Sequence, residues 1–293
     1  MTVCELTSRA DERPWTVRAA RTARVHWLRE LALLAALYVG YSLARLIGDA
    51  DFHSAVVHAR DLLALERLLH IDIEAPANAA LAAWTPLAVL ASYWYSLLHY
   101  VVTPAVLVWA YRRHHGDYRR VRDALILASA IGLVGFTLLP MAPPRMLPGF
   151  VDTLASTSSV GWWGGDASAP RGLGALTNQL AAMPSLHVGW AVWVAWVVVT
   201  HSTRRWVRVL AVAYPIGTTL VVVATANHYL LDAVAGAAVV AVAIRLSGRL
   251  AVPRPARRPA PVDCGPADSE PVVSELLDGE RVVGAGLGQR GRQ

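Results

Sequence analysis

Apolar residues along this chain of 293 residues gather into six runs that polar segments separate. A helix that crosses a lipid bilayer needs about 20 mostly apolar residues. The third run is short, Pro184-Ser185-Leu186 extends the fourth, and Pro215 is expected to bend the fifth. The runs cover residues 31–47, 87–110, 124–139, 187–200, 206–226 and 229–246. We therefore expect an all-α, polytopic membrane bundle of six transmembrane helices.

The composition favours a membrane protein over a soluble one. Hydrophobic residues make up 55% of the chain, charged residues make up only 16%, and the mean hydropathy is +0.40. Six buried helices of a soluble protein would leave too little polar surface to cover them. The first run follows a long basic leader and precedes no small-x-small cleavage site, so we expect an uncleaved anchor and not a signal peptide.

The basic residues predict the topology. All 27 of them are arginine, the net charge is +6, and they lie between the apolar runs, which is typical of topology signals and not of nucleic-acid binding. Arginines crowd the N-terminal segment and the segments after the second, fourth and sixth runs. The alternate segments, 48–80 and 140–183, hold only Arg60, Arg67, Arg145 and Arg171. The positive-inside rule therefore predicts a multi-pass cell-membrane protein with both termini in the cytoplasm.

Segments outside the runs complete the predicted organisation. Residues 52–70 place apolar side chains at helical spacing with charges between them, which predicts an outer helix on the membrane surface or across the bundle. Residues 140–183 form a long outer loop, a kind that is usually functional, and we expect Trp162 and Trp163 at the membrane interface. The predicted domains are a basic cytoplasmic segment (1–30), the six-helix domain (31–250) and a Pro-rich disordered cytoplasmic tail (251–293).

Three polar clusters interrupt the apolar sequence, and the predicted topology puts all three at the outer face. They are Pro143-Pro144-Arg145, Met183-Pro184-Ser185-Leu186-His187 and Asn227-His228-x3-Asp232. Helices that alternate in direction can bring these clusters together although they are distant in sequence. Their convergence is the main argument for a site.

Each cluster offers a chemical role. His228 and Asp232 are four apart and share a helix face, so the carboxylate can accept the proton of one ring nitrogen and leave the other nitrogen as a nucleophile. His187 can protonate a leaving oxygen as general acid. Pro184 is expected in a first helical turn, where free N–H groups and the Ser185 hydroxyl suit a phosphate, and Arg145 can bind its oxygens bidentately. The combination predicts phosphoryl transfer through a phosphohistidine, provided that His187 and His228 both reach one phosphate group.

Structural roles are the alternative for every one of these residues. His228 and Asp232 can form a structural pair, Arg145 can be an interfacial arginine after a helix end, and Ser185 can simply cap a helix. A zinc site from His187, His228 and Asp232 lacks a tight ligand motif, so we expect no metal. His70, His99 and His201 are interpreted as interfacial polar residues.

The same clusters resemble motifs of a known family. Met183-Pro-Ser-Leu-His187 is similar to the Pro-Ser-Gly-His motif of the type-2 phosphatidic acid phosphatase superfamily, and His228-x3-Asp232 is similar to its last motif, His-x3-Asp. With Pro143-Pro144-Arg145 the variants look most like the inositol phosphorylceramide synthase (inositolphosphotransferase) branch. The resemblance covers roughly residues 30–248. It implies a six-helix bundle with an outward-facing site, no metal or other cofactor, His228 as nucleophile, Asp232 as its orienting residue and His187 as acid.

The sequence departs from the family at the phosphate-binding positions. The first motif, Lys-x6-Arg-Pro, has Leu138 seven residues before Arg145, and the usual Arg six residues before the last-motif His is Val222. The phosphate charge must then be met by Arg145, Ser185 and backbone amides, Asn227, or another arginine such as Arg171. We expect a phosphorylated lipid as substrate, the bilayer as environment, water or a polyol such as inositol as acceptor, and no nucleic-acid partner.

Two functions of other classes remain open. A lipid or polyol transporter would need polar residues spread along its helices, whereas here they gather at one face. A catalytically inactive scaffold of the same fold would not need the set of His187, His228 and Asp232.

Overall fold

The computed structural model describes residues 28–33, 35–36, 39–40, 51–164, 171 and 178–250, all within one compact unit, Met1–Val252. Over these ranges the chain is helical and without strands, which confirms the all-α prediction. The predicted tail and all but the end of the predicted N-terminal segment lie outside them. The helices are α2 (Phe52–Leu68), α3 (Glu74–Ala82), α4 (Thr85–Tyr93), a π-helical turn (Trp94–Leu98), α5 (His99–Arg113), α6 (Tyr118–Leu138), a 3-10 turn (Pro144–Met146), α7 (Thr153–Ser156), α8 (Leu186–His201), α9 (Arg205–Ala224) and α10 (Leu230–Leu250).

The described helices supply fewer membrane spans than the six predicted. Three of them, α6, α9 and α10, are long and apolar enough to cross a bilayer. A fourth candidate is the pair formed by α3 and the continuous helix Thr85–Arg113, which is bent by 114° at its break. The fourth predicted run became α8, whose 16 residues reach about 24 Å at 1.5 Å per residue, short of the hydrocarbon core of about 30 Å. Of the first predicted run, the described residues are helical and the others lie outside the described ranges.

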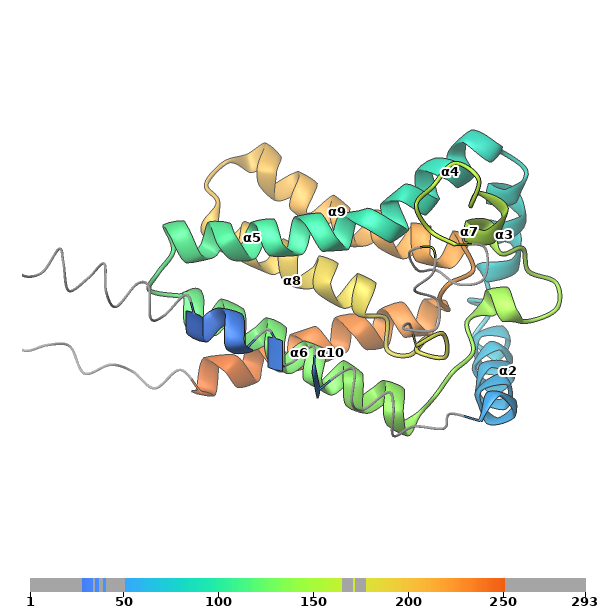
Figure 1. Cartoon of the computed structure of the whole chain (residues 1–293), viewed down its shortest axis with the longest axis horizontal. Coiled ribbons are helices and arrows are strands. Elements are labelled where there is room, and N and C mark those ends of the chain that lie inside the picture. The colour runs from blue at the N-terminus through green and yellow to red at the C-terminus, as the bar shows by residue number, and fades with distance from the viewer. Residues whose placement is uncertain are drawn as a thin grey trace, which may run out of the picture. The chain divides into compact units, whose positions relative to one another are not determined.

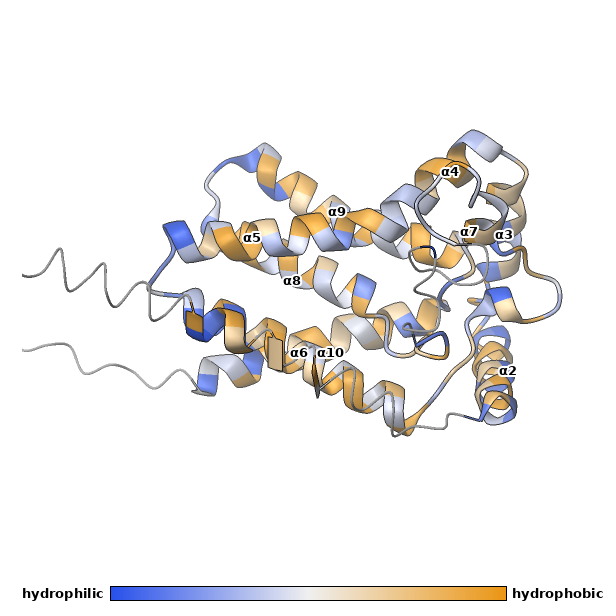
Figure 2. Cartoon of the chain, in the orientation of Figure 1, coloured by the Kyte–Doolittle hydropathy of each residue, from blue (hydrophilic) through white to orange (hydrophobic). Residues whose placement is uncertain are grey.

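Helix α8 lies at the centre of the bundle. It packs against α5, α6, α9 and α10, and its indole-bearing Trp193 is fully buried (Figure 1). Helix α9 instead presents apolar side chains outward: Trp206, Leu210 and Leu220 are each 61% exposed. Hydrophobic residues colour much of the α9 ribbon in Figure 2. A bilayer would cover such a face. Pro215 lies inside α9, which continues through it.

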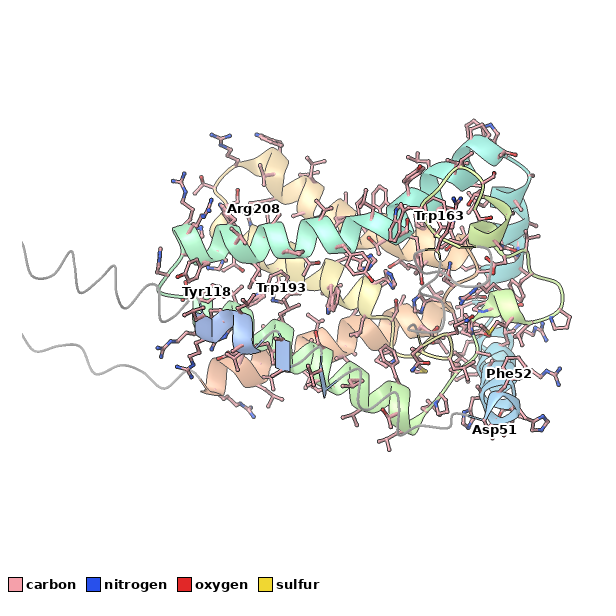
Figure 3. All side chains as sticks on the ribbon, in the orientation of Figure 1. Asp51, Phe52, Tyr118, Trp163, Trp193 and Arg208 are labelled. Carbon is pink, nitrogen blue, oxygen red and sulfur yellow. The ribbon has the colours of Figure 1, made fainter. Side chains whose placement is uncertain are left out.

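Helix α2 crosses one end of the bundle, as the sequence predicted for an outer helix (Figure 1). Asp51 caps it by accepting hydrogen bonds from the N–H groups of His53 and Ser54, both at 3.1 Å. Its buried face packs on the loop that follows α6 and on Tyr229 at the start of α10. Tyr118 and Arg208 lie at the opposite end of the bundle from Phe52 and Trp163 (Figure 3). The end that carries α2 is therefore the end where the three polar clusters meet.

Candidate active site

The turn between α9 and α10 presents His228. Helix α9 ends in a Schellman motif, in which Ala226 N donates to Val223 O (2.9 Å) and Asn227 N donates to Val222 O (3.1 Å). Ala226 adopts the left-handed conformation that glycine usually fills here, with φ of 58°. His228 N also donates to Val222 O at 3.1 Å. The backbone of the histidine is thus fixed to the end of α9 before α10 begins.

The imidazole of His228 has one defined tautomer. Its Nδ1 lies 2.8 Å from the carbonyl oxygen of Ala182 and 3.5 Å from Oδ2 of Asp232. A carbonyl oxygen can only accept, so Nδ1 must carry the proton, and Nε2 keeps the lone pair of a nucleophile. The ring is only 4% exposed. The sequence predicted that Asp232 accepts the ring proton. The nearer acceptor of the Nδ1 proton is the carbonyl oxygen of Ala182 in the loop before α8, and Asp232 Oδ2 is the more distant one.

Asp232 is fully buried and joins three parts of the site. Its Oδ2 accepts from Tyr229 N at 2.9 Å, and its backbone oxygen accepts from Ser185 N at 2.9 Å. Its Oδ1 has no hydrogen-bond partner among the described residues. The carboxylate therefore orders the first turn of α10 and stands beside the Nδ1 side of the His228 ring.

His187 projects from the first turn of α8 toward His228. The two ring centroids are 5.6 Å apart, and the rings are edge to face. The sequence-based hypothesis requires that one phosphate group contact both rings, and the two rings are neighbours. His187 is stacked on Tyr95 at 4.4 Å and meets the edge of His99 at 4.3 Å. His99, interpreted from the sequence as an interfacial residue, is buried beside the predicted acid.

The start of α8 differs from the prediction by one feature. Helix α8 begins at Leu186 with Ser185 as its N-cap, so Pro184 lies before the helix and not in its first turn. The Ser185 hydroxyl accepts from Val188 N at 3.5 Å and is fully buried, which fits the capping role left open above. The N–H groups of Leu186 and His187 have no acceptor among the described residues. These first-turn amides can bind an anion at the positive end of the helix dipole.

Arg145 joins the first cluster to the third. Its backbone N–H donates to Ala226 O at 2.8 Å, and its Nη1 donates to Oδ1 of Asn227 at 2.8 Å. Its Nε lies 3.5 Å from Oδ2 of Asp152, and its side chain is only 7% exposed. The guanidinium carries further N–H donors on Nη2. Two of the three predicted phosphate ligands thus lie near His228: Asn227 precedes it in the chain, and Arg145 contacts Asn227.

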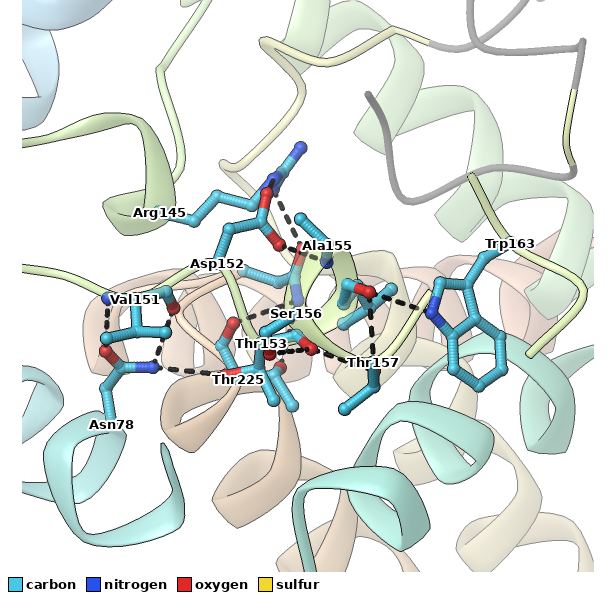
Figure 4. A network of polar contacts seen from close by, with 12 residues as sticks. Asn78, Arg145, Val151, Asp152, Thr153, Ala155, Ser156, Thr157, Trp163 and Thr225 are labelled. Carbon is cyan, nitrogen blue, oxygen red and sulfur yellow. Dashed lines mark hydrogen bonds and ion pairs between the residues drawn. The ribbon is translucent and has the colours of Figure 1, made fainter. Parts of the chain in front are cut away.

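Buried polar side chains hold the outer loop against this site (Figure 4). Asp152 caps α7 by accepting from Ala155 N at 2.9 Å while it also faces Arg145. Asn78 of α3 donates to Val151 O (3.0 Å) and to Ala224 O (2.9 Å), and accepts from Val151 N (2.8 Å). Trp163, predicted at the membrane interface, is instead fully buried and donates to Leu154 O, because its indole fills the core beneath α7.

All six predicted site residues thus come from segments that meet at one end of the bundle. Arg171, the alternative phosphate ligand, is exposed and donates to Ser158 O in the outer loop. Among the described residues, no three or more His, Cys, Asp or Glu side chains are arranged to hold a metal ion. The sequence analysis missed His99, Asn78 and Asp152, which carry no recognisable motif, and the buried Glu66 and Glu74, whose only signal was a carboxylate within an apolar helical pattern.

Comparison with known proteins gives one match. A family model described as the PAP2 superfamily matches residues 60–246, which include all three polar clusters. No curated protein and no solved structure matches the chain.

Proposed function

The chain belongs to the PAP2 superfamily, whose members are generally phosphoesterases, and from this premise we propose that it is a lipid-phosphate phosphatase or phosphotransferase that works through a phosphohistidine on His228. The observation that carries the proposal is the His228 ring. Its Nδ1 donates to Ala182 O, so in the neutral ring Nε2 carries the lone pair, and the centroid of the His187 ring lies 5.6 Å away. A nucleophile and a proton donor on two neighbouring rings suit a displacement at phosphorus.

In the first step Nε2 of His228 attacks phosphorus and the bond from phosphorus to the leaving oxygen breaks. The proton that this oxygen takes up passes to it through His187. The resulting phosphoimidazole carries positive charge on the ring, which the Asp232 carboxylate at 3.5 Å stabilises. In the second step water or an alcohol attacks phosphorus, the P–N bond breaks, and the proton of the attacking oxygen returns to His187.

The phosphate oxygens would be held by groups that replace the missing family ligands. The candidates are the free amides at the start of α8 and the remaining donors of Arg145, with Asn227 fixing the guanidinium. Ser185 contributes through the helix that it caps. The positive-inside pattern supports an outer-face location for this site and a phosphorylated lipid that enters from the bilayer.

The nature of the acceptor is the finer part of the proposal. Pro143-Pro144-Arg145 and Leu186, in place of the usual glycine, are the features that resemble the inositolphosphotransferase branch. We therefore favour an alcohol, with inositol the first to test, over water as the second substrate.

The test is incubation of the detergent-purified full chain with a panel of phosphorylated lipids, with and without inositol. Wild type should release or transfer the phosphoryl group, and His228→Ala and Asp232→Asn should lower the rate, His228→Ala by about a thousandfold or more. His187→Ala should accumulate acid-labile phosphate on the protein when the leaving group is a good one. The exposed His70→Ala is the matched control. Activity that survives both His228→Ala and Asp232→Asn would sink the mechanism.

A further inference from the structure

Three carboxylates from three elements bind consecutive amides at the start of α10. Tyr229 N donates to Asp232 Oδ2 at 2.9 Å, Leu230 N donates to Glu74 Oε1 at 2.8 Å, and Leu231 N donates to Glu66 Oε1 at 2.8 Å. Amides at this end of a helix have no partner within it, and the helix dipole favours negative charge there. Asp232 belongs to α10 itself, whereas Glu74 comes from α3 and Glu66 from α2.

These carboxylates are buried without a described cation. Glu66 is 0% exposed and Glu74 is 1% exposed, and neither takes part in an ion pair among the described residues. Each binds one amide through Oε1, while its Oε2 is buried without a partner. A buried carboxylate that lacks a counter-charge is costly. The positive end of α10 offsets only part of this cost, so the arrangement holds only while the helix start stays in place.

The neighbouring carboxylates Glu74 and Asp232 disfavour a negative charge on Glu66. Burial raises the pKa of Glu66 to about 8. The hydrogen bond from Leu231 N–H lowers this pKa, and the neighbouring carboxylates of Glu74 and Asp232 raise it. Glu66 therefore keeps its proton at neutral pH. Tyr229 is the other titratable group that faces the cluster, and burial beside these carboxylates raises the pKa of its phenol as well. His228 contacts the cluster through Asp232.

We propose that Glu66 and Glu74 are positioning residues of the active site. They hold the first turn of α10 against α2 and α3, and this turn carries Asp232 and follows His228. The proposal rests on the proposed function, since it assigns these residues to the alignment of His228. The link is short: Leu230 and Leu231 lie between the histidine and the aspartate, and their amides are the anchored ones. Release of this turn would displace the nucleophile relative to His187, and small displacements of that kind lower kcat roughly a hundredfold.

The positioning role predicts a specific alkaline limit. Ionisation of Glu66 adds a further buried charge beside the carboxylates of Glu74 and Asp232, so the anchored turn loosens above about pH 8. Wild-type kcat should then fall about tenfold per pH unit above this limit, with little change in KM. Glu66→Gln keeps an oxygen for Leu231 N–H but cannot ionise, so its kcat should persist to higher pH. Asp61→Asn is the matched control, because Asp61 is an exposed carboxylate on the same helix.

Amide hydrogen exchange on the wild-type full chain tests the same idea without any variant or turnover. Protection of Tyr229, Leu230 and Leu231, corrected for the intrinsic rate, should fall as pH rises through about 8, while the centre of α10 stays protected. An alkaline limit that is the same in wild type and Glu66→Gln, or protection that does not change with pH, would overturn the proposal. A chain that is inactive on every lipid would refute the proposed function, while the exchange result would still decide whether these glutamates hold the turn.

Discussion

In the proposed mechanism, Arg145 takes the place of the family's missing phosphate ligands. Its side chain is 7% exposed, and two of its nitrogens have different partners: Nη1 donates to Asn227 Oδ1, and Nε faces Asp152 Oδ2. A lysine keeps the charge but not the fork of donors. Arg145→Lys should therefore raise KM for a phosphorylated lipid about tenfold or more, as expected when charge-assisted bonds to phosphate are lost. Steady-state kinetics with Arg67→Lys, an exposed arginine of α2, as the control would check this; equal KM values in all three proteins would contradict it.

Substitutions of His99 can distinguish a packing role from a role in proton transfer. Its ring lies edge to face with His187 at 4.3 Å and tilted against Tyr100 at 3.9 Å, so it can hold the predicted acid in place by contact alone. His99→Phe keeps an aromatic ring there and should lower kcat less than about tenfold, whereas His99→Ala leaves a cavity and should lower it much more. His201→Phe, at the opposite end of the bundle, is the control. Equal losses for Phe and Ala would mean that the ring nitrogens matter.

Glu66 also predicts how stability depends on pH. Its pKa rises from the ordinary 4.5 to about 8 on folding, so the folded state holds the proton more tightly than the unfolded state. Its stabilising contribution is complete below about pH 4.5 and is lost as pH rises through about 8. The melting temperature of wild type should therefore decline relative to Glu66→Gln across this window. A constant difference, measured by thermal unfolding in detergent at a series of pH values, would refute the assignment.

At the scale of elements, the closest approach lies between α8 and α10. A side-chain carbon on Gly236 would stand 2.1 Å from the backbone oxygen of Ser185. Gly236→Ala must push the two helices apart at the point where Ser185 N binds Asp232 O, and should destabilise the fold by about 1–3 kcal/mol. Gly248→Ala, on the same helix, meets only the Arg120 side chain at 3.5 Å and should be neutral or slightly stabilising. Thermal unfolding of both variants would decide, and equal melting temperatures would contradict the prediction.

The sequence predicted elements better than spans. Apolar periodicity located α2, α9 and α10 to within a few residues, because lipid-facing and core-facing positions are apolar alike. It located the end of α6 but not its start, since the predicted run began at residue 124 and the helix begins at Tyr118. It predicted a transmembrane span at α8, but this helix has only 16 residues. The chain turns into the site before its start and into a loop before Arg204 after its end. It also placed Pro184 inside that helix. The cap is made by Ser185, a role that the sequence left open, and the backbone N–H of Ser185 also donates to Asp232 O of α10.

At the scale of the whole molecule, the sequence predicted that the three clusters lie at one face. It did not predict the buried side chains that hold the segments around these clusters in place. Topology alone argued that Arg145, His187 and His228 share one face. Glu66 and Glu74 stabilise a turn more than 150 residues away in sequence, at separations of 165 and 156 residues, and a single sequence carries no trace of such pairing. The same is true of Asn78, which links α3 to both the outer loop and the end of α9.

The orientation of the molecule in its membrane is the remaining prediction of this scale. The arginine-rich segments follow α5, α8 and α10, and Arg208 lies at the end of the bundle opposite Phe52 (Figure 3). The positive-inside rule therefore puts α2 and the site outside the cell and the turn before α9 inside. Serine in place of Cys4 and Cys264 gives a background in which one introduced cysteine can be labelled. A membrane-impermeant maleimide should label Arg60→Cys, on the exposed face of α2, in intact cells.

Thr203→Cys, in the exposed turn between α8 and α9, should react only after the membrane is permeabilised. Detergent-solubilised protein is the control in which both cysteines must react. The reverse pattern would place the site in the cytoplasm and would change which pool of acceptors can reach it. Since water is present on both sides but alcohol acceptors such as inositol differ between them, orientation bears directly on whether the second step is hydrolysis or transfer.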